Sequence, residues 1–210
     1  ILSVGIPSII MSSVGSAMTF GMNKILITFS STAVAVFGVY FKLNSFVFMP
    51  VFGLNNGMVP IVSYNYGAQN KKRLTKTIKL AIMYAVCIML IGIMLFQFMP
   101  DVLLKLFDAS DHMLEIGIPA LRVISLSFAF AGICIVISSS LQALGHGFLS
   151  MMISITRQLI ILLPSAYILA KFGGIHAVWW SFNIAEIGSL TLSLLFFKHM
   201  YNKIIKHLGE

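Results

Sequence analysis

Long runs of apolar residues, broken by short polar stretches, dominate the chain. Each run is apolar on all sides of a helix rather than on one stripe, which is typical of a helix buried in a membrane. Six runs predict six transmembrane helices, at residues 6–29, 33–62, 77–98, 118–143, 148–170 and 175–197. A spanning helix needs about 20 residues, so six of them with short connections account for all 210 residues. The pattern predicts an all-α membrane protein with one six-helix domain over residues 1–210.

Strands do not fit this pattern. A membrane barrel would show segments of about ten residues that alternate between apolar and polar. Backbone groups in lipid must be satisfied within the structure, which a helix achieves along its own length. Composition agrees, because the chain is 59% hydrophobic and 10% charged, whereas about a quarter of a soluble domain is charged.

The basic residues lie where they would fix the orientation of the helices. The net charge is +8, which in a soluble protein would suggest nucleic acid. In short membrane loops, however, Lys and Arg mark the cytoplasmic side, so we expect no nucleic-acid partner. The connection after the second run and the C-terminal tail are therefore predicted to be cytoplasmic, through Lys71, Lys72, Arg73, Lys76, Lys79, Lys198, Lys203 and Lys206. The acidic connection after the third run is predicted to lie outside.

A group of helix-weakening residues stands at the end of the second run. Gly53, Gly57 and Pro60 are followed by Asn65-Tyr66-Gly67-Ala68 and then by the basic residues. Glycine and proline both disfavour a helix interior. We expect the second helix to weaken here as it leaves the membrane, and Gly67-Ala68 to turn the chain.

This passage resembles the MATE family (multidrug and toxic compound extrusion). In that family a Gly-x-x-x-Gly-x-x-Pro pattern, then Asn-Tyr-Gly-Ala and a basic run, closes the second helix of each six-helix lobe. Later motifs agree in order: Leu141 to Gly145 resembles the end of the fourth helix, Arg157-Gln158 with Pro164 the fifth, and Gly173-Gly174 with Ala185-Glu186 the sixth.

The resemblance implies the C-terminal lobe of a twelve-helix transporter in a bacterial cytoplasmic membrane, with the N-terminal six-helix lobe as its missing partner. It implies efflux of hydrophobic cationic drugs by alternating access, as antiport against protons or sodium ions, with no other cofactor. One lobe alone is not expected to transport. Some sodium-linked members carry acidic ligands in the first and fourth helices of a lobe. The corresponding runs here contain no carboxylate, so coupling through those positions is not expected.

Two groups of residues are candidates for a site. A drug cavity needs an adaptable apolar lining, for which methionine is well suited. The candidates for such a cavity are Met11, Met18, Met22, Lys42, Asn44, Phe46 and Phe48. Lys42 has a structural alternative, in which its long side chain reaches the interface or a structural partner.

The second group is Arg157, Glu186 and Asn183. Arg157 is expected about 21 Å below the outer end of the fifth helix and Glu186 about 16 Å below that of the sixth. Unpaired charges at this depth are costly, so we predict an ion pair between the two helices. The pair is either a static bridge or a proton-accepting device centred on Glu186. The remaining possibility is an unpaired Arg157 that reaches the cytoplasm.

Three other functions compete with drug export. A flippase for lipid-linked oligosaccharides would need a strongly cationic cavity, and Lys42 and Arg157 are the available cations. A non-transporting assembly subunit would fit the half-size chain. A membrane-embedded enzyme would need a catalytic constellation at membrane depth, where only Glu186 is available. The sequence shows no metal-ligand spacing and no nucleophile–base pair, so we expect neither an enzyme nor a metal site.

Overall fold

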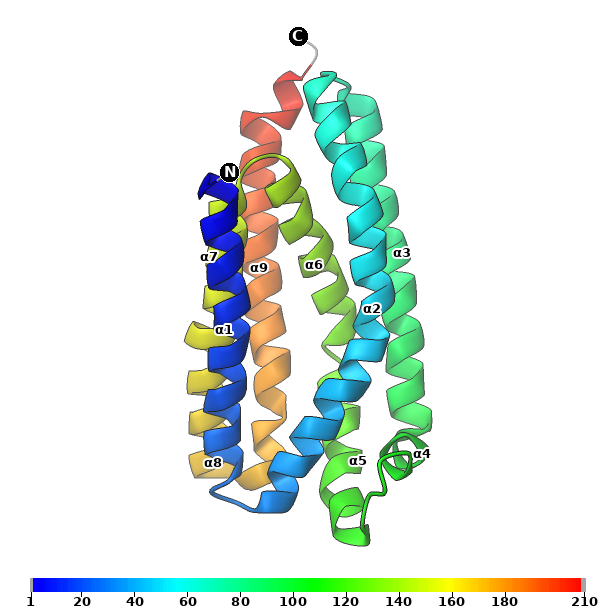
Figure 1. The fold of residues 1–210 in the computed structure, drawn as a ribbon, viewed down its shortest axis with the longest axis vertical. Coiled ribbons are helices and arrows are strands. Elements are labelled where there is room, and N and C mark those ends of the chain that lie inside the picture. The colour runs from blue at the N-terminus through cyan, green and yellow to red at the C-terminus, as the bar shows by residue number, and fades with distance from the viewer. Residues whose placement is uncertain (1, 209–210) are drawn as a thin grey trace.

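The bundle consists of helices that run along one long axis (Figure 1). The computed structural model describes the backbone of residues 2–208 and all of their side chains except those of residues 2–5 and 8. Within that range no strand occurs. The helical elements in chain order are α1 (Leu2–Leu26), α2 (Ser31–Gly67), α3 (Lys71–Phe98), α4 (Pro100–Lys105), α5 (Asp111–Ser125), α6 (Phe128–Ala143), α7 (Gly147–Ile155), the π-helical segment η1 (Thr156–Leu162), α8 (Leu163–Val178), α9 (Trp180–Lys203) and the 3-10 turn η2 (Ile205–His207).

Four helical stretches of the described chain are long and apolar enough to cross a membrane. They are α2, α3, the continuous stretch 147–178 and the stretch 180–207. A fifth arises if α5 and α6, which meet at an angle of 50°, count as one broken span. The expected total of six therefore stays a prediction.

The second helix is longer than expected. α2 passes through Gly53, Gly57 and Pro60 without ending and stops at Gly67. The predicted weakening therefore does not end the helix at these residues, and its effect on stability stays a prediction. The chain turns one step later, where Gln69 adopts a left-handed φ of 56°. The Asn70 amide then donates to the Asn65 carbonyl at 2.9 Å and closes the turn.

The connections also differ from the expected boundaries. α5 begins at Asp111, where the Ser110 hydroxyl caps it by accepting from the Met113 amide at 3.3 Å. The predicted break between the fifth and sixth helices is present at Gly174, whose φ of 68° and ψ of −169° interrupt the helical backbone inside the stretch labelled α8. Only glycine adopts that backbone conformation readily.

α6 lies at the centre of the bundle. In Figure 1, α1, α7, α8 and α9 stand on one side of it and α2 and α3 on the other. α6 packs against α2, α3, α7 and α9. Its approach to α3 depends on Gly132, since a Cβ there would meet Met89 Cγ at 2.9 Å and the Ala85 carbonyl oxygen at 3.4 Å. Small residues allow such close contacts between membrane helices.

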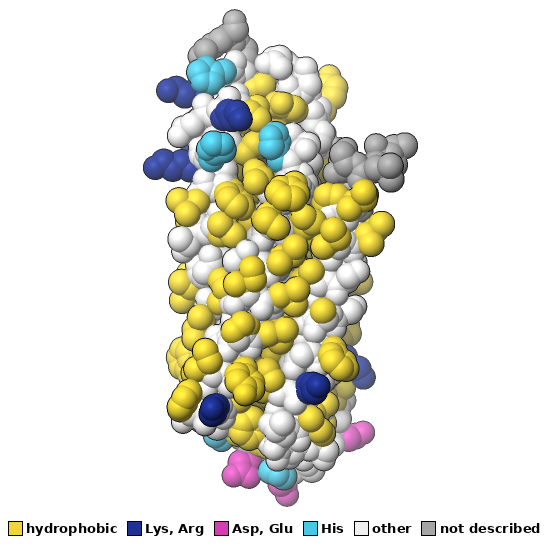
Figure 2. Space-filling view, turned by 90° about the vertical axis from the view of Figure 1, so that its left-hand side faces the viewer, with side chains coloured by type: hydrophobic (Ala, Val, Ile, Leu, Met, Phe, Trp, Pro, Cys, Tyr) yellow, Lys and Arg dark blue, Asp and Glu magenta, His cyan; other side chains and the backbone are white. Residues whose placement is uncertain are grey.

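The surface divides into three zones along the long axis. Figure 2 shows a broad hydrophobic middle, with Lys, Arg and His gathered at one end, while Asp and Glu lie at the other end together with further basic and His side chains. The α2–α3 turn and the C-terminal tail share the basic end, where Lys71 Nζ donates to the Lys206 carbonyl at 2.6 Å. The two segments predicted to be cytoplasmic therefore lie at the same end of the molecule.

A candidate substrate cavity with a buried charge pair

A large cavity opens between the two sides of the bundle. Its volume is about 1140 Å³, and α1, α2, α6, η1 and α9 line it. Most of the wall is apolar, and its larger apolar and aromatic side chains are Met18, Phe20, Tyr40, Phe41, Phe46, Phe48, Met49, Phe52, Phe128, Ile135, Leu162 and Phe182. A smaller set of polar side chains interrupts it: Ser12, Ser16, Thr19, Asn23, Asn44, Ser45, Ser127, Arg157, Gln158 and Glu186.

Arg157 and Glu186 are the charged residues among those that line this cavity. Arg157 Nη1 donates to Glu186 Oε1 at 2.9 Å, and the two side chains are 28% and 13% exposed. The predicted pairing is therefore present. The pair joins η1 to α9, and its two charges cancel at the cavity wall.

The segment that carries Arg157 is not an ordinary α-helix. η1 is a π-helix of seven residues between α7 and α8. Pro164 lies two residues after its end and has no N–H to donate to the Ile160 carbonyl, which disfavours regular α-helical bonding there. Such π-helical insertions are frequent at functional sites. Here the insertion sets the rotation that turns Arg157 and Gln158 towards the cavity.

Aromatic rings hold the neighbouring wall in place. Phe48 packs edge-on against Phe128 with ring centroids 5.3 Å apart, and Tyr40 packs against Phe182 at 5.6 Å. The Tyr40 hydroxyl donates to Asn44 Oδ1 at 3.4 Å.

Four of the seven predicted cavity residues line the cavity: Met18, Asn44, Phe46 and Phe48. The other three predictions are wrong in position. Met22 is fully buried in the core. Met11 packs towards α7, where its sulfur lies 3.7 Å from the Ser150 hydroxyl. Lys42 points away from the cavity, with its ammonium 5.7 Å from the centre of the Phe107 ring.

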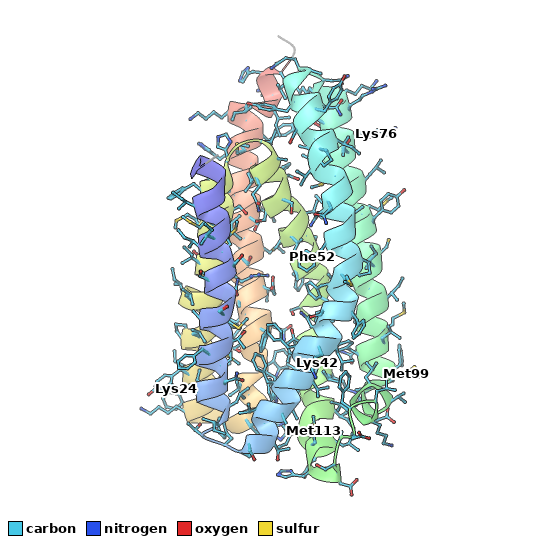
Figure 3. All side chains as sticks on the ribbon, in the orientation of Figure 1. Lys24, Lys42, Phe52, Lys76, Met99 and Met113 are labelled. Atoms are coloured by element: carbon cyan, nitrogen blue, oxygen red, sulfur yellow. The ribbon has the colours of Figure 1, made fainter. Side chains whose placement is uncertain are left out.

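Figure 3 shows where Lys42 lies on α2, below the level of Phe52 and on the half of the helix that approaches α5. The side chain is exposed. An exposed lysine near the bundle end can reach water along its flexible stem. This position agrees with the structural alternative for Lys42 rather than with a role in the cavity.

Asn183 does not join the charge pair. Its Nδ2 donates to the Val123 carbonyl at 2.8 Å and so ties α9 to α5. Asn183 is absent from the cavity wall, because it shares a face with Trp179, which is fully buried.

The family-motif residues form no part of the cavity wall. Gly53, Gly57 and Pro60 are exposed, and a Cβ added at either glycine would meet nothing within 4 Å. Asn65 is 6% exposed, and its side chain donates to the Ile61 carbonyl at 2.8 Å. Tyr66, Gly67 and Ala68 complete the helix end, where the Ala68 amide donates to the Tyr64 carbonyl.

Several cavity residues were not anticipated from sequence. Tyr40 lies one turn before Asn44, and Gln158 follows Arg157 directly, so spacing alone could have suggested both. Phe128 and Phe182 carry no such mark, since they are ordinary aromatic residues in apolar runs. No cluster of three or more metal-ligating side chains occurs in the part of the chain that the structure describes.

A family profile described as MatE matches residues 7–168, more than three quarters of the chain. The chain belongs to the MATE family. Curated relatives agree: the multidrug export protein MepA of Staphylococcus haemolyticus is 27% identical over 97% of this chain. MepA of Staphylococcus aureus is 30% identical over 89% of it. The alignments cover 45% and 41% of those proteins, so this MATE chain spans less than half the length of the curated relatives it matches.

Solved structures show the same fold. A MATE transporter in its bent conformation superimposes with a TM-score of 0.92 at 23% identity, over all of this chain and 47% of that one. Vibrio cholerae VcmN in its bent form gives 0.90 at 18% identity, over 96% and 46%. One MATE lobe thus has the architecture seen here.

Proposed function

We propose that this MATE chain forms one lobe of a secondary transporter that exports hydrophobic cationic drugs in exchange for protons or sodium ions. The observation that carries the proposal is the cavity, in which an apolar, aromatic wall surrounds one partly buried carboxylate. Drug-sized pockets usually measure about 300–1000 Å³ and have a few placed polar groups in an apolar lining. Rings such as Phe48 and Tyr40 attract cations through their faces.

A second lobe would complete the cavity. Phe20, Phe46 and Met49 line it and are each at least 71% exposed. Large apolar side chains of a membrane protein also face lipid, so it is the place of these three on the cavity wall that points to a second lobe as their partner. The relatives are about twice as long as this chain, which leaves room in them for a second lobe. Alternating access by rocking of two lobes around a central site would then follow the general scheme of secondary transporters.

The pair of Arg157 and Glu186 is the candidate for coupling. A cationic drug competes with the Arg157 guanidinium for the Glu186 carboxylate, and so does a proton. Binding of the drug would therefore be linked to loss of the proton at this carboxylate, and binding of the proton to loss of the drug. Antiport requires this linkage. The basic end of the bundle is assigned to the cytoplasm, because positively charged loops are retained there.

The flippase alternative has weaker support. A pyrophosphate substrate needs an excess of positive charge, but Lys42 points away from the cavity and Arg157 is neutralised by Glu186. An assembly role without transport would leave the charge pair and the open volume of the cavity unexplained by packing alone. We therefore retain drug export as the function.

Photo-crosslinking tests this assignment. A photoreactive hydrophobic cation is bound to the purified chain in lipid nanodiscs, irradiated and mapped by mass spectrometry. We expect labels on Met18 and Phe48 that disappear with an excess of a second hydrophobic cation. Labelling confined to lipid-facing residues such as Leu90 and Phe98, unaffected by the competitor, would count against the proposal.

A further inference from the structure

A row of buried polar atoms without partners extends from the charge pair along α9. Glu186 Oε2 and the hydroxyls of Ser189 and Ser193 are all buried and have no hydrogen-bond partner among the described residues. Ser189 and Ser193 are both fully buried. Spacings of three and four residues place the three side chains on one face of the helix. Buried polar atoms are nearly always bonded, so each of these requires an explanation.

The other hydroxyls of α9 are satisfied in the usual way. Ser181 donates to the Val178 carbonyl at 2.6 Å, and Thr191 donates to the Ile187 carbonyl at 3.0 Å. This bond to the preceding turn is the common solution for serine and threonine in helices. Ser189 and Ser193 do not adopt it, so their hydroxyls stay without a hydrogen bond where α9 packs against α6.

The facing side of α6 continues the polar row. The Cys134 thiol lies close enough to the hydroxyls of Ser189 and Ser193 to interact with them electrostatically, but neither hydroxyl has the geometry of a hydrogen bond. One turn further on, Ser138 is hydrogen-bonded to Ser150 of α7, and Gln142 Nε2 donates to Ser150 Oγ at 2.8 Å. Cys134, Ser138 and Gln142 are four residues apart and share one face. The row therefore reaches the end of α6 at Ala143, near the basic end of the bundle.

We propose that this row holds water and connects the Glu186 carboxylate to the solvent at the basic end of the bundle. Adjacent groups on α9 are separated by about 4.5–6 Å along the axis. One water that bonds to both neighbours spans about 5.6 Å. Single waters between Glu186, Ser189 and Ser193 therefore satisfy all three orphaned atoms.

The path carries protons rather than metal cations. The four groups along the path are two hydroxyls, a thiol and a carboxylate already neutralised by Arg157, whereas a sodium ion needs a shell of hard oxygen ligands and thiols are soft. Protonated Oε2 gives its proton to the first water, each water passes one on, and the last releases one to solvent. Glu186 is then again a carboxylate held by Arg157. The titratable groups that interact with Glu186 within the described chain are Arg157, Tyr40 and Cys134.

This inference rests on the proposed function and specifies a proton as its coupling ion. In this scheme the substrate approaches Glu186 from the cavity, and the proton leaves Glu186 on the side that faces α6. The proton exit would then lie at the end of the bundle where Lys and Arg gather.

Cys134 provides a built-in probe of hydration. The chain has two cysteines, so a Cys87→Ser variant in lipid nanodiscs leaves Cys134 as its sole thiol. Infrared spectroscopy after transfer to D₂O follows the conversion of its S–H group to S–D. We expect rapid exchange in this parent. In the double variant Ser189→Ala/Ser193→Ala the S–H exchange of Cys134 should be about tenfold slower or more. The two substitutions leave an apolar gap, and such a gap stays free of water.

Two further variants complete the test. Thr191→Val removes a satisfied, exposed hydroxyl from the same stretch of α9 and should exchange like the parent. Gln142→Leu closes the end of the row and should slow exchange, if water enters from the basic end. Slow exchange in the parent, or equal rates in parent and double alanine variant, would overturn the proposal. An unchanged rate in Gln142→Leu would show that water enters elsewhere and would refute the direction. Because no drug is present, failure of this path and failure of drug export are separate outcomes.

Discussion

Glu186 is bonded to Arg157 through one of its two carboxylate oxygens. Oε1 accepts from Arg157 Nη1 at 2.9 Å, whereas Oε2 is buried without a partner in the described part of the chain. The carboxylate thus has one oxygen on the cation of η1 and a second, buried oxygen that is open to another partner. A group in this position can exchange partners without a change in the backbone.

Neutralising one member of the pair should destabilise the lobe. Arg157→Gln or Glu186→Gln leaves an unpaired charge in a membrane segment, which costs about 2.5–3.5 kcal/mol on insertion scales. The double variant Arg157→Gln/Glu186→Gln leaves no charge and should be more stable than either single variant. Thermal unfolding of purified variants measures this order. Equal loss in all three variants would mean that the pair packs but does not interact.

Asn183→Ala should weaken the contact between α9 and α5. It removes the bond from Asn183 Nδ2 to the Val123 carbonyl. Such bonds between membrane helices contribute about 0.6 kcal/mol on average and up to about 1.7 kcal/mol. Chemical unfolding compares the free energy of unfolding of Asn183→Ala with that of Asn202→Ala, a control at an exposed position of the same helix. The idea fails if the two variants are equally stable.

Replacing a glycine by a larger residue should lower the stability of the chain at Gly132 but not at Gly57. Gly132→Val forces Met89 and the Ala85 carbonyl apart, and overpacking of this kind costs about 1–3 kcal/mol. Gly57→Ala meets open space and gains helix propensity, so it should not lower the stability of this chain. Both are compared with the parent by unfolding in detergent. Loss of stability in Gly57→Ala alone would contradict the packing described here.

The two ends of the bundle should react from opposite sides of the membrane. In a Cys87→Ser background, Gln69→Cys lies at the α2–α3 turn and His112→Cys at the start of α5. A membrane-impermeant thiol reagent added to intact cells should label the second and spare the first. The first should react once the inner face is exposed. Labelling of Gln69→Cys from outside would reverse the assigned orientation.

The charge pair could be predicted from sequence, whereas the direction in which individual side chains point, into the core, the cavity or away from both, could not. A charge at membrane depth needs a partner, and the short connection between the last two runs left Arg157 and Glu186 as neighbours. Met22 and Lys42 lie in helices whose apolar residues surround the axis, so no hydrophobic stripe defines which side faces inward. Their placement in the core and near Phe107 required the packed structure.

The π-helix and the polar row were also beyond sequence reasoning. Pro164 indicates a disturbance in its helix, but a kink, a break and a π insertion all satisfy that constraint. The insertion decides which way Arg157 points. Ser189 and Ser193 are unremarkable in sequence, and only their missing partners in the packed bundle distinguish them from Ser181 and Thr191.

The most direct test of the account is the affinity of the purified chain, in lipid nanodiscs, for a lipophilic quaternary cation. Arg157→Gln exposes a bare carboxylate to the cavity and should tighten binding, whereas Glu186→Gln exposes a bare guanidinium and should weaken it. Lys42→Gln removes a positive charge outside the cavity wall and should leave affinity unchanged. Phe48→Ala should weaken binding about two- to fivefold, the value of a lost cation–π contact. The account is contradicted if Arg157→Gln and Glu186→Gln shift the affinity in the same direction or not at all. The pair would then not determine the preference of the cavity for cationic ligands.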